Sequence, residues 1–249
     1  MGNIDETIIM LWDKVKSISN KYSDVKDLIV NNDTTELAAD TFQSIKVINN
    51  IGKLYDMIKF KHFIKGLNCD DITRQDIDKL IKYMDNQKKA EFIYSTMKKI
   101  INSNSKICCY IIGILFNEIT KKNREIRQID IAIINALGNL NDFEINNFYR
   151  LLKEYYKTNP KKIKGVYICV DEMKNFAKIL QIDLDDLTLT AEVCDKNQLF
   201  YRENYADLNI DEYAIGNSRI NYDDDYKITV VGKKLYELVN YYYELQKEK

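Results

Sequence analysis

The stretch Thr158-Asn159-Pro160-Lys161-Lys162-Ile163-Lys164-Gly165 divides the chain into two parts of different character. Pro160 is the only proline among 249 residues. Proline cannot continue a helix, and it biases the preceding residue away from helical backbone. Before this stretch apolar residues recur with helical spacing, and after it come β-type runs and many acids. We therefore expect a mainly α protein, with a helical domain over 1–157, a linker over 158–165 and a smaller α+β module over 166–249.

The N-terminal part opens with apolar residues that alternate three and four positions apart, at Ile4, Ile8, Leu11, Val15, Ile18, Tyr22, Val25 and Ile29. Such a stripe keeps one face towards a partner helix. Residues 34–65 have the pattern of a second helix, and Asn31-Asn32-Asp33 has the length of a turn between antiparallel helices. We favour a helical hairpin over 1–66, ended by Gly66 as a C-terminal cap. The alternative is a homodimer formed through the heptad helix of residues 4–29.

The rest of this part predicts a helical bundle over 73–157, with helices at 73–84, 87–102, 105–120, 127–138 and 142–157. The longest apolar run, Ile107 to Phe116, is about half the roughly 20 residues that a membrane span requires. We therefore expect no membrane span and assign this run to a buried core helix. Gly113 lies inside the run, where a glycine is best explained by close packing against a neighbour.

Beyond the linker the pattern predicts a helix over 170–180, short strands over 187–193 and 198–201, and a strand from Tyr226 that leads into a closing helix. The segment Ile228-Thr229-Val230-Val231-Gly232-Lys233-Lys234-Leu235 resembles the end of many prokaryotic winged-helix modules, in which the second strand of the wing leads out through a Thr-x-x-Gly turn. The resemblance covers roughly residues 165–240. It implies a winged-helix fold, whose DNA-binding members present Lys and Arg to phosphates.

Charge in this module is the opposite of what DNA binding requires. Residues 171–226 hold fourteen acids and five bases, so the resemblance implies a fold more than a DNA-binding activity, and the acids favour a basic protein partner. Residues 1–160, with 24 bases and 21 acids, are a better place for nucleic acid. The residues that would contact nucleic acid, if it binds, are Lys121, Lys122, Arg124, Arg127, Lys161, Lys162, Lys164, Lys233 and Lys234.

Two groups of aspartates have the oxygen ligands that a hard cation prefers. They are Asp183, Asp185 and Asp186, and Asp223, Asp224 and Asp225. Neither group has the spacing of an EF-hand loop. Aspartate also tolerates turn conformations and blunts exposed strand edges, so we favour solvated turns and expect neither a metal nor a cofactor.

Catalytic signatures are missing from the sequence. His62 is the only histidine, it lies among three lysines, and no nucleophile or phosphate-loop motif accompanies it. The five cysteines form no Cys-x-x-Cys pair, and Cys108 and Cys109 lie inside the apolar run, where cysteine packs as a small hydrophobe.

These features predict a non-enzymatic, cytoplasmic protein that binds a protein partner and acts as a regulator. The start Met1-Gly2-Asn3-Ile4-Asp5-Glu6 lacks the apolar segment of a secretory signal. Abundant Ile, Asn, Lys and Tyr indicate an AT-rich coding genome, as in a low-GC bacterium, its phage or a large virus. A bacterial or phage origin suggests a role in immunity or host–phage conflict. The alternatives are a nucleic-acid-binding regulator that uses the winged-helix-like module and, third, a carboxylate-metal enzyme.

Overall fold

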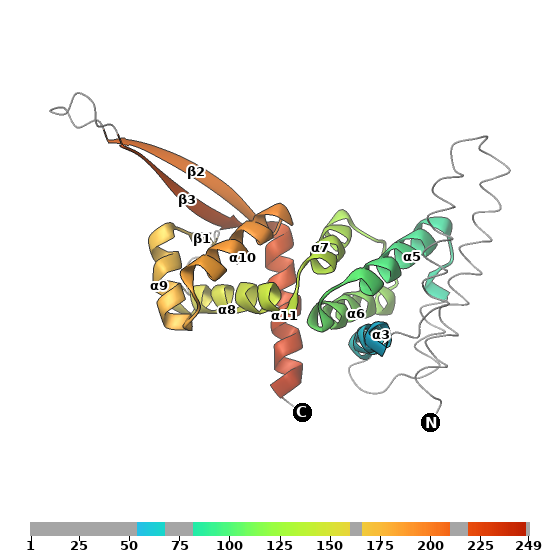
Figure 1. Cartoon of the computed structure of the whole chain (residues 1–249). Helices are drawn as coiled ribbons and strands as arrows, with labels where there is room; N and C mark the ends of the chain where they lie inside the picture. Colours follow the sequence, from blue (N-terminus) through green and yellow to red (C-terminus); the bar gives the residue numbers. More distant parts are fainter. Residues whose placement is uncertain (1–53, 68–81, 160–165, 210–218, 248–249) are drawn as a thin grey trace. The chain divides into compact units, whose positions relative to one another are not determined.

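The structure, a computed structural model, describes residues 54–67, 82–159, 166–209 and 219–247. Within them the chain forms eight helices and one antiparallel sheet of three strands, so the expectation of a mainly helical protein is confirmed. The chain divides into two compact units (Figure 1). Unit 1 ends at Asn141, and unit 2 runs from Asp142 to Lys247.

Unit 1 is built around one central helix. Its described helices are α3 (Leu54–Leu67), α5 (Gln87–Asn102), α6 (Lys106–Lys121) and α7 (Gln128–Asn139). Helix α6 packs against α3 and α7, and every residue from Cys108 to Phe116 is buried. A helix that is apolar all round is stable only when it is surrounded, so the predicted core helix is confirmed.

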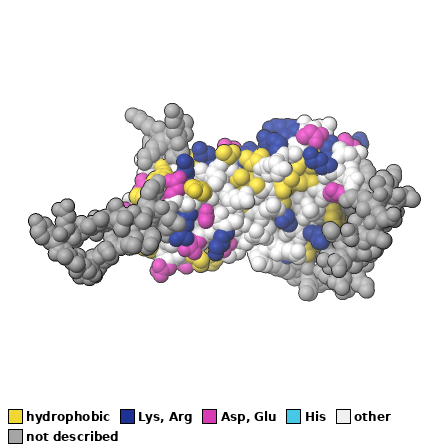
Figure 2. Space-filling view, turned by 90° about the horizontal axis from the view of Figure 1, so that it is seen from above, with side chains coloured by type: hydrophobic (Ala, Val, Ile, Leu, Met, Phe, Trp, Pro, Cys, Tyr) yellow, Lys and Arg dark blue, Asp and Glu magenta, His cyan; other side chains and the backbone are white. Residues whose placement is uncertain are grey.

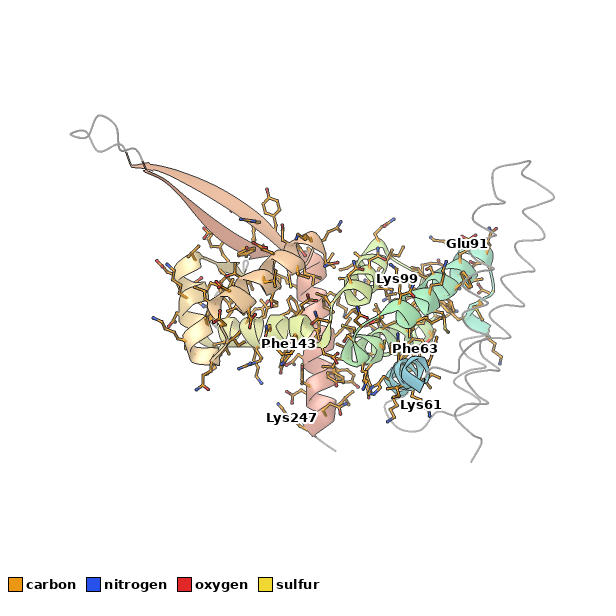
Figure 3. The ribbon with its side chains drawn as sticks, viewed as in Figure 1. Lys61, Phe63, Glu91, Lys99, Phe143 and Lys247 are labelled. Carbon is orange, nitrogen blue, oxygen red and sulfur yellow. The ribbon has the colours of Figure 1, made fainter. Side chains whose placement is uncertain are left out.

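Aromatic rings join three of these helices. The ring of Phe116 on α6 lies 5.6 Å from that of Phe63 on α3 and 5.3 Å from that of Phe92 on α5. Phe63 is labelled in Figure 3, beside α6. Such ring pairs add roughly 0.5–1.5 kcal/mol to the gain from burying their area.

The helix starts explain why the predicted bounds agree with the structure to within one residue. Asn86 caps α5 by accepting a hydrogen bond from the Lys89 amide at 3.0 Å. Ser105 caps α6 in the same way, from the Cys108 amide at 2.8 Å. Asn and Ser satisfy amides that the first helical turn leaves unpaired, so these starts are fixed by local chemistry.

Gly66 has a different role from the one predicted. It lies inside α3, which continues to Leu67, and does not end the helix. At this point α3 crosses α6: a Cβ on Gly113 would lie 2.8 Å from the Gly66 Cα and would overlap the carbonyl oxygen of Phe63. A Cβ on Gly66 would in turn overlap the carbonyl oxygen of Tyr110. The two glycines therefore set how closely α3 approaches α6.

Unit 2 combines four helices with the sheet. In chain order its elements are α8 (Asp142–Thr158), β1 (Tyr167–Ile168), α9 (Val170–Leu180), α10 (Leu184–Lys196), β2 (Phe200–Asn209), β3 (Arg219–Ile228) and α11 (Val230–Lys247). The strand order is β1-β3-β2. Strands β2 and β3 pair from Phe200 opposite Ile228 to Asn209 opposite Arg219. They form a long hairpin that projects away from the helices of this unit (Figure 1).

The division between the units lies earlier than the sequence predicted. Helix α8 packs against α9, α10 and α11, so it belongs to unit 2 and not to the helical domain expected over 1–157. The ring centres of Phe148 on α8 and Phe200 on β2 lie 5.8 Å apart, and the Tyr155 hydroxyl of α8 accepts a hydrogen bond from the Tyr167 amide at 3.2 Å. Pro160 therefore follows, in the sequence, a helix that belongs to unit 2.

The strand predicted over 187–193 is wrong, because these residues lie in α10. Leu187, Leu189, Ala191 and Val193 alternate as in a strand. The buried residues are instead Leu187, Thr190, Ala191 and Cys194, with helical spacing. The helix expected over 170–180 and the strand leading into the closing helix are confirmed. The strand expected over 198–201 starts at Phe200 and continues to Asn209.

Several predictions fall outside the described residues. They are the stripe of residues 4–29 with its homodimer, most of the hairpin over 1–66, nearly all of the helix over 73–84, and the linker residues 160–165. In the part of the chain that the structure describes, no helix is both long enough and apolar enough to cross a bilayer.

The position of the boundary can be tested with two fragments. A fragment of residues 142–247 should unfold cooperatively in a thermal circular-dichroism experiment. A fragment of residues 158–249 should not, because it lacks the six apolar side chains that α8 buries. Cooperative unfolding of the shorter fragment would restore the boundary at Pro160.

The crossing of α3 and α6 can be tested with one methyl group. Gly113→Ala should lower the free energy of unfolding by about 1–3 kcal/mol, and Gly113→Leu at least as much, because the backbone of α3 leaves no room. Gly138→Ala is the matched control in α7: its Cβ would meet only the Lys99 side chain, at 3.4 Å. Equal urea-denaturation midpoints for the two alanine variants would contradict the close crossing.

Candidate functional site

Helix α10 begins at the first of the two aspartate groups. Asp183 is its N-cap, and its side chain accepts a hydrogen bond from the Asp185 amide at 2.8 Å. Asp185 and Asp186 lie in the first turn, where the helix dipole stabilises negatively charged side chains. These three residues therefore have a structural reason to be acidic that involves no metal.

One side of α10 faces solvent and is acidic around a leucine. Asp185, Leu189 and Glu192 follow one another at helical spacing, and Asp186 lies beside them. The Leu189 side chain is 56% exposed. We call these four residues the α10 face. Exposed single leucines are common, but one enclosed by three acids combines an apolar anchor with a charged rim.

The opposite side of α10 is fixed to α8 by buried polar groups. The Asn147 side-chain amide donates to the Thr190 hydroxyl at 3.2 Å, and that hydroxyl donates to the Asp186 carbonyl at 2.8 Å. Both side chains are buried. A satisfied buried pair holds its elements in one arrangement, so the α10 face is presented on a rigid helix.

The end of α10 is also tied to the hairpin. The Asp195 carboxylate accepts a hydrogen bond from the Arg202 amide of β2 at 3.1 Å. Next to Arg202, Tyr201 is 59% exposed. The base of the hairpin therefore has a fixed relation to α10 and adds an exposed aromatic ring to the same unit.

The second aspartate group is divided along β3. Asp225 is buried, accepts a hydrogen bond from the Tyr167 hydroxyl, and lies opposite Glu203 in the strand register. Asp224 lies opposite Asn204 and Asp223 opposite Tyr205. Among the side chains that the structure describes, no three His, Cys, Asp or Glu residues are placed to hold a metal ion.

Two of the predicted nucleic-acid contacts are engaged inside unit 1. Arg124 donates to both oxygens of Asp130, at 2.6 and 2.9 Å, and Arg127 adds its backbone amide at 2.9 Å. Asp130 is fully buried at the start of α7. Burial alone would raise the pKa of Asp130, but the hydrogen bonds from Arg124 and Arg127 outweigh it, so the pKa is lowered.

The other predicted basic contacts that the structure describes lie partly in unit 1 and partly in unit 2. Lys122 pairs with Glu118 at 3.5 Å, and Lys234 pairs with Glu237 at 3.4 Å. Lys121 ends α6 in unit 1, whereas Lys233 lies in the first turn of α11 in unit 2. Lys161, Lys162 and Lys164 lie outside the described residues. On the face shown in Figure 2, basic side chains lie among acidic ones.

His62 lies half-buried on α3, in unit 1. The buried Cys108 and Cys109 point their sulfur atoms towards carbonyl oxygens, at 3.7 Å from Leu140 and 3.9 Å from Ile100. Such distances suit weak donors in a packed core.

Leu189, Glu192 and Tyr201 are site residues that were not predicted from the sequence. The first two lie in the stretch assigned to a strand. The sequence is also compatible with a helix there, because Asp183 is a capping residue, followed by Leu187, Ala191 and Cys194 at intervals of three and four. Comparison of the chain with protein-family models, with curated proteins and with solved structures gives no match.

The Asp130 cluster gives a prediction for stability and its pH dependence. Asp130→Asn should lower the free energy of unfolding by about 2 kcal/mol at pH 7, less than for a fully buried pair because the Arg124 side chain is 18% exposed. Because the folded pKa of Asp130 is depressed, its contribution is complete above about pH 4 and is lost as the pH falls through the folded pKa.

Denaturation of the wild-type protein and of the Asp130→Asn variant at several pH values checks this pH dependence of stability. The difference between wild type and Asp130→Asn should shrink below about pH 4. Asp171→Asn, which removes the exposed pair with Lys174 in the other unit, is the control and should change stability by less than about 1 kcal/mol. A difference that is independent of pH would contradict the assigned ionisation of Asp130.

Proposed function

We propose that this protein acts by binding another protein, and that the α10 face of unit 2 is the contact surface for a basic partner. The observation that carries the proposal is Leu189, exposed on a rigid helix and enclosed by Asp185, Asp186 and Glu192. An apolar anchor supplies binding energy when it is desolvated, and the charged rim steers a partner of opposite sign. No catalytic step is part of the proposal.

The arrangement of unit 2 supports a winged-helix-like interpretation of the module. Helix α8, strand β1, helices α9 and α10, the β2–β3 hairpin and α11 follow one another as in that fold, and β3 is the central strand. The Thr-x-x-Gly turn has a physical basis: the Thr229 hydroxyl accepts from the Gly232 amide at 3.0 Å, and a side chain on Gly232 would overlap the Leu199 carbonyl.

This interpretation also favours a protein partner over DNA. In a helix-turn-helix module the second helix enters the major groove, and α10 takes that place in unit 2. Its exposed side carries three acids and one lysine, Lys196, and the net negative charge would repel phosphates. A nucleic-acid-binding regulator is the competing proposal, and it requires basic residues elsewhere to outweigh α10. A carboxylate-metal enzyme is the third.

A crosslinking experiment with the full chain tests the proposal. A photoreactive residue at position 189 should give a discrete protein adduct in cells of the source organism. Asp185→Lys with Glu192→Lys should abolish the adduct, because the rim then repels a basic partner. One control has the photoreactive residue at position 174, exposed on α9, and should give no such adduct. A second control keeps the photoreactive residue at position 189 and adds Asp171→Lys and Glu237→Lys, which change the net charge equally, and it should retain the adduct.

Measuring the affinity of the full chain for duplex DNA distinguishes the protein-binding proposal from the nucleic-acid-binding alternative. The wild-type chain should show no appreciable affinity for duplex DNA at about 150 mM salt in a fluorescence-anisotropy titration. An affinity that falls steeply with salt, together with no adduct at position 189, would replace the protein-binding proposal by nucleic-acid recognition.

A further inference from the structure

Charge is distributed unevenly between the two units. Residues 1–141 of unit 1 hold 21 Lys and Arg and 18 Asp and Glu, whereas residues 142–247 of unit 2 hold 15 Lys and Arg and 19 Asp and Glu. The chain is close to neutral as a whole, with a net charge of −1, so this asymmetry does not appear in its composition.

The basic excess of unit 1 includes a segment without acids. No Asp or Glu occurs from residue 92 to residue 117, which spans most of α5, the turn at 103–105 and most of α6. Three lysines flank that turn, Lys98 and Lys99 on α5 and Lys106 at the start of α6. We call these three residues the lysine end.

The lysine end is built on fixed elements. The stem of Lys99 lies against α7, where a Cβ on Gly138 would be 3.4 Å from its Cβ (Figure 3). The Lys98 ammonium lies 6.0 Å from the centre of the Tyr94 ring. The turn itself is held by the buried Lys59, which donates to the carbonyls of Ile101 and Ser103. Lys98, Lys99 and Lys106 are all half-buried, and a lysine can pack its stem on the protein while its ammonium group reaches water.

We infer that the basic partner of the α10 face is a second copy of this chain, bound through its lysine end. The inference rests on the proposed function, and it adds the identity of the partner. The chemistry is complementary: three carboxylates around Leu189 meet three ammonium groups beside the exposed side chains of Asn102 and Asn104.

The two surfaces are different, so the contact is heterologous. Each copy offers one α10 face and one lysine end, and a contact of this kind continues from copy to copy until it closes into a ring or grows as a chain. Attraction between exposed charges is screened by salt. The protein should therefore associate progressively with concentration and dissociate as salt is raised.

Sedimentation velocity on the full chain tests this with two neutralised variants. In the first, Asp185→Asn, Asp186→Asn and Glu192→Gln remove the rim of the α10 face. In the second, Lys98→Gln, Lys99→Gln and Lys106→Gln remove the lysine end. Each variant alone should associate at least about tenfold more weakly than wild type. Circular dichroism establishes that both variants fold, and Lys65→Gln with Lys82→Gln and Lys88→Gln is the control at exposed lysines of unit 1.

Mixing the variants gives the decisive result. The first keeps its lysine end and the second keeps its α10 face, so an equimolar mixture should form a complex of one copy of each and nothing larger. Monomers in the mixture, or wild-type protein that stays monomeric at low salt, would overturn the inference. A dimer that persists in both variants and in high salt would also overturn it, in favour of an interface elsewhere such as residues 4–29.

The outcomes separate this inference from the proposed function. A monomeric wild-type chain that still gives a foreign protein adduct at position 189 refutes the second copy as partner and leaves the protein-binding proposal intact. Salt-dependent binding of duplex DNA that only the lysine-end variant loses would overturn the inference and assign that surface to a polyanion.

Discussion

Burial of one side of α8 is the constraint on which unit 2 depends. Every other helix of the unit packs against α8, and the first strand is tied to it through the Tyr155 hydroxyl. Phe148 contributes the apolar contact to Phe200, while Asn147 contributes the polar contact to Thr190. The apolar contact stabilises the arrangement without fixing direction, and the hydrogen bond fixes which side of α10 faces inward. The same contact that builds the core therefore decides that Leu189 faces solvent.

Charged side chains serve two separate purposes in this protein. Some make structural contacts within the fold. Asp130 accepts hydrogen bonds from Arg124 and Arg127 at the start of α7, and the buried Lys59 donates a hydrogen bond to a backbone carbonyl where α5 ends. Groups of this kind are costly to leave unpaired, so they are unsuited to a transient partner. Others, such as Glu192, stay at the surface with their charge available. Formal charge counted along the sequence does not distinguish the two: within the basic group at 121–127, Arg124 and Arg127 pair with Asp130, whereas Lys121 and Lys122 remain exposed.

The aspartates at the start of α10 show how one residue type can satisfy a local and a global requirement together. Asp183 caps the helix, and the negative charges of Asp185 and Asp186 interact favourably with the helix dipole. The same two also border Leu189 on the outer surface. Acidity at this position stabilises the helix and at the same time disfavours contact with phosphate. The proposed contact with a second copy uses this surface and the acid-free turn between α5 and α6.

The sequence by itself determined the helices whose starts carry their own caps, such as Asn86 for α5 and Ser105 for α6, and the buried central helix, because the apolar run around Gly113 leaves no polar side. Those features depend on neighbours within a few residues. Only the tertiary structure decided the boundary at Asp142, the role of Gly66 and the state of residues 187–193. In each case the deciding contact is made with a residue that is distant in sequence. Helix α8 packs against α10 and α11, Gly66 lies against the carbonyl of Tyr110, and Thr190 is hydrogen-bonded to Asn147. Alternation at 187–193 is compatible with a strand or a helix, and the choice between them was made by which side could be buried against α8.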